Sequence, residues 1–309
     1  MSQRRKSAFT LTEMLVVIGV IVLLVALLFP VLSQVKLRGQ RAKCLNNIRQ
    51  LSLASFMYVN DNGKPMPYKP AASYPGGTWM GTITELIKVQ DVLICPSAPL
   101  QKPAPASGNR PGCADKSWVR WTDDNRTMFS GSYGYNAWLY ADLEKYYRVD
   151  ATRLYTQENA IESPSQTPAF VDANWVDLSP KETDGRWPNL YTGAPFGTSS
   201  DNQMGRCLIL RHGNRSASSA PRNLEPNDKM PGAIQMGFAD GHAALVPLED
   251  LWKYYWSANW KVPQRRRIDM SSGQCLQLVI SNAIPKLRRS GMVGVGANIA
   301  AGGRSSPSM

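Results

Sequence analysis

Residues 8–32 read AFTLTEMLVVIGVIVLLVALLFPVL, and this stretch decides the architecture of the chain. From Met14 to Phe29 no residue carries a charged side chain. At a rise of ~1.5 Å per residue, a helix from Phe9 to Leu32 would be ~36 Å long, which is enough to cross a hydrocarbon core about 30 Å thick. The stretch therefore predicts a single membrane-spanning helix.

The residues before this helix have the pattern of a processing signal. A basic leader, MSQRRKSA, ends at the small residue Ala8 and is followed by FTLTE, whereas no A-x-A-like cleavage site follows the apolar run. This arrangement resembles the class III signal of type IV prepilins and type II secretion pseudopilins. The resemblance implies that a prepilin peptidase/methyltransferase cuts between Ala8 and Phe9 on the cytoplasmic side and methylates Phe9. Ala8 stands where that family usually has Gly, so we expect slower processing.

Glu13 and Pro30 are the two exceptional residues of the predicted span. A carboxylate near the centre of a bilayer costs about 2.5 to 3.5 kcal/mol on insertion scales, so Glu13 needs a partner. Glu13 is the fifth residue from Phe9, and the resemblance implies that it pairs with the N-terminal amine of an adjacent subunit. The alternative is a carboxylate solvated by lipid headgroups. Pro30 removes a backbone donor, so it predicts a helix kink or simply marks the membrane exit.

The helix is expected to continue beyond the membrane. Apolar or small residues recur at spacings of four, three, four and three, which places them on one face of an amphipathic helix. Asn60-Asp61-Asn62-Gly63 then predicts the helix end. We therefore expect a leader over 1–8, a membrane or filament-core helix over 9–32 and its amphipathic continuation over 33–60. The residues of the amphipathic face are Cys44, Ile48, Leu51, Ser55 and Tyr58.

Beyond the helix, short apolar runs separated by turn residues predict strands. Asp240-Gly241 predicts a two-residue hairpin turn. Residues 248–260 predict a short helix packed on the sheet, with an exposed aromatic ligand platform as the alternative. The fold class is therefore α+β: a long helix packed on a mostly antiparallel sheet in a domain over 61–283, followed by a basic Gly/Ser-rich tail over 284–309. The predicted strands lie in SYGYNAWLY (132–140), TPAFVDANW (167–175), CLILRHG (207–213) and AIQMGFADGHAALVPL (233–248).

Four stretches resemble a subset of pseudopilin-like proteins with large C-terminal domains. They are residues 44–67 (CLNNIRQLSLASFMYVNDNGKPMP), 93–97 (LICPS), 132–136 (SYGYN) and 237–242 (GFADGH). In that subset a His stands about ten residues before the Asp-Gly turn. Here His212 precedes Asp240 and Gly241 by a longer polar insertion, which argues against a contact between His212 and Asp240.

The five cysteines form no C-x-x-C pair and have no His at metal-ligand spacing, so the sequence predicts no zinc site and no cofactor. Cys95 and Cys113 flank a loop rich in Pro and Gly, which makes them the candidate disulfide of an exported chain. The alternative is a set of separate buried thiols.

The formal net charge of +12 is unevenly distributed. Residues 1–8 carry +3, residues 9–60 carry +4, residues 61–260 carry −2 and residues 261–309 carry +7. The basic end could contact a polyanion, with a solvated tail as the alternative. Its candidate contact residues are Arg265, Arg266, Arg267, Arg288 and Arg289.

The chain has no G-x-S-x-G elbow, P-loop or H-E-x-x-H motif, so we do not expect an enzyme. The first hypothesis is a prepilin-like structural subunit, a minor pilin or pseudopilin, with a cytoplasmic N-terminus, one pass through the inner membrane and a periplasmic domain. It would assemble with other subunits into a type IV pilus or a type II secretion pseudopilus and reach the filament or cell surface. The alternative is a minor pilin that binds DNA or a glycan through its basic end.

Overall fold

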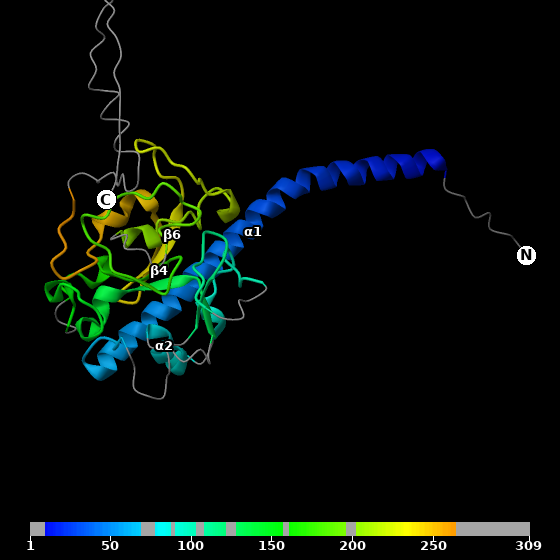
Figure 1. Cartoon of the computed structure of the whole chain (residues 1–309). Helices are drawn as coiled ribbons and strands as arrows, with labels where there is room; N and C mark the ends of the chain where they lie inside the picture. Colours follow the sequence, from blue (N-terminus) through cyan, green and yellow to red (C-terminus); the bar gives the residue numbers. More distant parts are fainter. Residues whose placement is uncertain are drawn as a thin grey trace, which may run out of the picture. The chain divides into compact units, whose positions relative to one another are not determined.

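The computed structural model describes residues 10–68, 78–87, 90–102, 108–121, 128–156, 161–195 and 202–263 (Figure 1). Ala8 and Phe9 lie outside the described residues, as do the five arginines of the basic end. Cleavage, methylation and polyanion binding therefore stay predictions.

Helix α1 (Leu11–Asn62) is the predicted long helix and is continuous through Pro30. It begins with a capping box, because the Glu13 N–H donates to the Thr10 hydroxyl at 3.3 Å and the Thr10 N–H donates to the Glu13 carboxylate at 2.8 Å. It ends at Gly63, which has a φ of 64° and donates its N–H to the Val59 carbonyl at 2.8 Å. The predicted stop signal is thus confirmed, with glycine in the left-handed conformation that ends many helices.

The two halves of α1 have different surroundings. Among the described residues, α1 is the one helix that is long and apolar enough to cross a membrane, and none of its apolar window is buried. The second half of α1 packs on strands β4, β6 and β7 of the sheet, and Figure 1 shows it running beside β4 and β6. The apolar half therefore lacks any cover within the described part of the chain.

The domain is built on a five-stranded sheet in the order β5-β3-β4-β6-β7. All neighbouring strands are antiparallel except β3 and β5, which are parallel, so the predicted α+β class with a mostly antiparallel sheet is confirmed. The strands of this sheet are β3 (Tyr133–Asn136), β4 (Pro168–Asp172), β5 (Asp177–Leu178), β6 (Ala233–Phe238) and β7 (Ala243–Pro247).

Smaller elements surround this sheet. Strands β1 (Trp118–Trp121) and β2 (Met128–Gly131) form a separate antiparallel hairpin, and α2 (Trp79–Ile87) is a short helix. The short 3-10 helices are η1 (Gln90–Leu93), η2 (Ala137–Leu139), η3 (Leu143–Lys145), η4 (Ala151–Arg153), η6 (Pro164–Gln166), η7 (Met204–Arg206), η8 (Ala217–Ser219) and η9 (Leu248–Lys253).

The strand predicted over 207–213 is wrong. Cys207 to Leu210 are buried but irregular, and only His212 pairs with β6, through an isolated bridge to Ala233. The Leu210 N–H instead donates to the Leu190 carbonyl at 2.8 Å. A short run of apolar residues indicates that the segment is buried. It does not identify a strand, because it lacks the alternation of apolar and polar residues that is typical of one.

The hairpin predicted around Asp240-Gly241 is confirmed, but its turn is longer than two residues. The Phe238 N–H donates to the His242 carbonyl at 2.9 Å, which leaves Ala239, Asp240 and Gly241 in the loop. Gly241 has a φ of 87°, as expected for the last residue of a three-residue hairpin loop.

The helix predicted over 248–260 is shorter than expected, because the 3-10 helix η9 ends at Lys253. Trp252, Trp256 and Trp260 are buried, and the Trp256 indole N–H donates to the Leu251 carbonyl at 2.8 Å. These three tryptophans belong to the core, so they do not form an exposed ligand platform.

Candidate functional site

Helix α1 approaches β6 closely at Gly237. A Cβ atom added at this glycine would overlap the Ser52 hydroxyl and lie 3.2 Å from the Ile48 carbonyl oxygen. At the following turn, a Cβ on Gly241 would lie 2.7 Å from Leu53 Cδ2. The two glycines of GFADGH therefore let α1 pack directly on the hairpin.

The LICPS and SYGYN stretches meet beside the same helix. The Asn47 side-chain amide on α1 donates to the Ile94 carbonyl at 3.0 Å. The Ser132 N–H donates to the Leu93 carbonyl at 2.9 Å, and its hydroxyl donates to the Ala98 carbonyl at 2.8 Å. One of the four stretches that resemble the pseudopilin-like subset forms the buried half of α1, and the other three lie beside it or beside one another there.

A disulfide joins α1 to the LICPS segment. It links Cys44 to Cys95 across 51 residues of sequence. The predicted Cys95–Cys113 disulfide is therefore wrong. The Cys113 thiol is free and donates to the Asp115 carboxylate at 3.1 Å, and burial together with this hydrogen bond raises its pKa. Closeness in sequence misled the prediction, because the buried face of α1 brings Cys44 nearer to Cys95 than the Pro- and Gly-rich loop brings Cys113.

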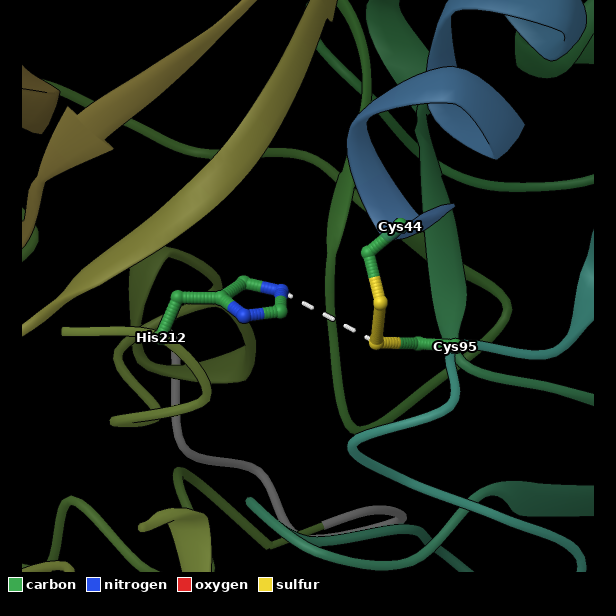
Figure 2. Close-up of side chains that lie close together, drawn as sticks. All are labelled: Cys44, Cys95 and His212. Atoms are coloured by element: carbon green, nitrogen blue, oxygen red, sulfur yellow. Dashed lines mark hydrogen bonds between the residues drawn. A yellow bond between two sulfur atoms is a disulfide. The ribbon is translucent and has the colours of Figure 1, made fainter. Parts of the chain in front are cut away.

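His212 lies beside this disulfide (Figure 2). Its Nε2 atom is 3.8 Å from Cys95 Sγ and 3.2 Å from the Asp172 carboxylate. Two backbone hydrogen bonds to Ala233, of 2.9 and 2.8 Å, hold His212 against the first residue of β6. The imidazole and both sulfur atoms are buried.

Asp172, at the end of β4, contacts two members of a buried cluster, His212 and Arg211. The cluster consists of Cys44, Cys95, Asp172, Arg211 and His212. Its carboxylate forms an ion pair of 3.2 Å with Arg211 and accepts a 2.7 Å hydrogen bond from the Gln235 N–H. Burial by itself raises the pKa of Asp172, but His212 and Arg211 outweigh this effect, so the pKa lies below its usual value. The carboxylate is therefore ionised, and its charge is matched inside the protein. Arg211 also donates to the backbone carbonyls of Cys113, Ala114, Ser132 and Ala173.

His212 and the Asp-Gly turn lie at opposite ends of β6. His212 bridges Ala233, whereas Asp240 follows Phe238 and accepts from the His242 ring at 2.6 Å. The expectation that His212 does not meet Asp240 is consistent with this placement. Sequence reasoning missed Asp172, the actual carboxylate partner of His212.

Sequence reasoning also missed Cys44 and Arg211 as members of the cluster. A signal was available for Cys44, because Cys44 and Cys95 both lie in the stretches that resemble the pseudopilin-like subset, whereas Cys113 does not. Nothing in the sequence singles out Arg211, whose role depends on the carbonyls that surround it.

A cavity of about 300 Å³ lies next to the cluster. Its walls include His212, together with Gln40 and Arg41 of α1 and Pro96 of the LICPS segment. The cavity reaches His212 and Arg211, whereas neither cysteine of the disulfide lines it.

Comparisons with protein-family models, with curated proteins and with solved structures found no match for this chain. The role of the site therefore rests on its own chemistry. In the oxidised form that chemistry is a covalent joint between α1 and the domain, next to a charge-matched His-Asp-Arg cluster.

Proposed function

We propose that this chain is a prepilin-like structural subunit, a minor pilin or pseudopilin, that assembles through the apolar half of α1 into a pilus or secretion pseudopilus. One observation carries the proposal: a single helix is apolar and uncovered in its first half, whereas in its second half one face is buried against the domain.

The uncovered half needs another environment. Large apolar side chains point outward all around it, for example Ile18, Leu23 and Leu28, which are 59%, 62% and 55% exposed. A helix that is apolar on every side is stable in a lipid bilayer or among other apolar helices. Both environments occur in the life of a filament subunit, first as a membrane protein and then in the filament core.

Glu13 fits this proposal. In the single chain its carboxylate accepts from the N–H and the hydroxyl of Thr10, each at 2.8 Å, at the exposed start of α1. This internal partner makes the charge tolerable before assembly. On assembly, Glu13 would exchange Thr10 for the N-terminal amine of a neighbouring subunit, which would fix the register between helices.

The buried cluster gives the domain a fixed position on this helix. The disulfide lies at Cys44, which follows the apolar half after a short basic segment, and Gly237 lets β6 contact α1 directly. A domain that is covalently joined to its helix moves with the helix in a filament. The proposed role of the disulfide is therefore mechanical.

The proposal is tested by intact-mass measurement of the full chain, purified from membranes of cells that contain a prepilin peptidase. We expect a chain that begins at N-methylated Phe9. Ala8→Gly should be processed faster and Ala8→Leu should block cleavage, because the peptidase requires a small residue there. A membrane-bound chain that retains Met1 in cells that process a known prepilin would overturn the proposal.

A further inference from the structure

We propose that the thiol form of this protein holds one tetrahedral transition-metal ion of the Zn²⁺ class between Cys44, Cys95 and His212, with the Asp172 carboxylate or a solvent molecule as the fourth ligand. The disulfide and the metal ion would then be two alternative ways of joining α1 to the domain. This inference concerns the domain alone and does not depend on the proposed filament role.

The ligand atoms already lie close together. One sulfur atom from each cysteine and a ring nitrogen of His212 all lie within 4.8 Å of one another, and Figure 2 shows His212 pointing at the pair of sulfur atoms. They come from α1, from the LICPS segment and from the residue that bridges β6. This wide separation in the chain is why spacing rules for zinc sites did not reveal them.

The distances fit a tetrahedral ion. With zinc bonds of ~2.3 Å to sulfur and ~2.0 to 2.2 Å to nitrogen and oxygen, the edges of the tetrahedron are about 3.4 to 3.8 Å long. His212 Nε2 is already 3.8 Å from Cys95 Sγ and 3.2 Å from Asp172 Oδ2. Metal binding requires the two sulfur atoms to separate once the bond between them is broken, and Asp172 has to approach the sulfur atoms if it is to be the fourth ligand.

The charges also balance. The two thiolates neutralise the two positive charges of the ion, and Arg211 already neutralises Asp172 through an ion pair of 3.2 Å. The buried cluster would therefore be neutral with the metal bound. Neutrality matters because an unmatched charge at such a buried position is strongly unfavourable.

The surrounding residues are those that a metal site requires. Asp172 is oriented by Arg211 and by the Gln235 N–H, which donates to it at 2.7 Å. Such outer hydrogen bonds fix the direction of a ligating carboxylate. Of the proposed ligands, His212 lines the cavity of about 300 Å³, so an ion that enters there would meet the imidazole first.

The conversion needs a reductant, and a cellular dithiol is the appropriate class. The dithiol gives two electrons and two protons to the Cys44–Cys95 bond, which breaks to form two thiols, while the dithiol itself becomes a disulfide. Metal binding then releases the two thiol protons to solvent.

The test uses the full chain in detergent, reduced anaerobically with a phosphine and titrated with Co²⁺. We expect one Co²⁺ per reduced chain, with the intense visible bands of tetrahedral cobalt and sulfur-to-cobalt charge transfer, and no such spectrum for the oxidised chain. His212→Ala should weaken binding by at least about tenfold. Cys113→Ser and Cys207→Ala should leave it unchanged, because these thiols lie outside the cluster.

A second measurement uses only the wild-type chain, so that it still tests the proposal if a variant does not fold. X-ray absorption of the Zn²⁺-loaded, reduced wild-type chain should give two sulfur ligands at ~2.3 Å and two lighter ligands at ~2.0 to 2.2 Å. Three results would overturn the proposal: a reduced, folded chain that binds no metal stoichiometrically, a bound ion without two sulfur ligands, or a reduced chain that loses its near-ultraviolet circular dichroism even with metal present.

Discussion

The two halves of α1 are one continuous helix with opposite relations to the rest of the chain. In the first half Ile18 and Leu23 are largely exposed, whereas in the second half Ile48 and Leu51 are fully buried. The first half is apolar on every side, and the second half is apolar mainly on the face that meets β4 and β6. The contrast shows that the halves were shaped for different surroundings, one outside this chain and one within it.

The largest expected effect is a loss of filament assembly without any loss of domain stability, which would separate the role of the first half of α1 from that of the second. Glu13→Gln keeps a side chain that can cap the helix but removes the charge, so we expect filament assembly to be lost while the domain unfolds at the same denaturant concentration as wild type. Thr10→Ala is the matched control, because it removes the cap but keeps the charge, and it should still assemble. Recovery of sheared filaments, measured by mass spectrometry, distinguishes them. Loss of assembly in Thr10→Ala together with normal assembly of Glu13→Gln would mean that Glu13 acts only as part of the cap.

The second prediction concerns only the stability of the domain that packs on the second half of α1. Asp172→Ala leaves Arg211 buried without its counter-charge, so we expect a loss of about 3 to 5 kcal/mol in the free energy of unfolding. Asp150→Ala is the control, because that carboxylate is exposed and loses only a solvent-screened ion pair with Arg153 and the cap of η4, so we expect a much smaller loss. Tryptophan fluorescence during denaturant unfolding in detergent reports the domain. Membrane insertion of the first half should not change in either variant.

The smallest effect tests how closely the second half of α1 approaches the sheet. Gly237→Ala should cost about 1 to 3 kcal/mol, because its Cβ would overlap the Ser52 hydroxyl. That hydroxyl has no hydrogen-bond partner among the described residues, so Ser52→Ala alone should cost little. The double variant should regain part of the lost stability, as measured by a double-mutant cycle. If the two changes were simply additive, the close approach of α1 and β6 would not be the cause.

Much of the fold follows from local patterns. The long uncharged run predicted the first half of α1, the Gly63 stop predicted its end, and Asp240-Gly241 predicted the β6–β7 hairpin. These predictions succeeded because helix periodicity, left-handed glycine and hairpin turns depend on neighbouring residues. The predictions of a strand over 207–213 and of a helix over 248–260 failed. Both segments are short, and their backbone conformation follows from how they are buried and not from the preferences of neighbouring residues.

The candidate site was harder to predict than the fold. Cys113 is nearer to Cys95 in sequence than Cys44 is, and no pattern in the sequence pointed to Asp172 as the partner of His212. The structure instead pairs Cys95 with Cys44 and places His212 beside Asp172. Neither partner follows from spacing, because each pair joins segments that meet only when α1, β4 and β6 are packed together.

The sequence by itself determined that the chain has one long helix with an apolar first half, an amphipathic second half and an α+β domain. These properties follow from the order of apolar and polar residues along the chain. Only the tertiary structure decided which cysteines bond, which carboxylate meets His212 and how Arg211 is neutralised. Those outcomes depend on distances between segments far apart in sequence, and on the need of every buried charge for a partner within reach.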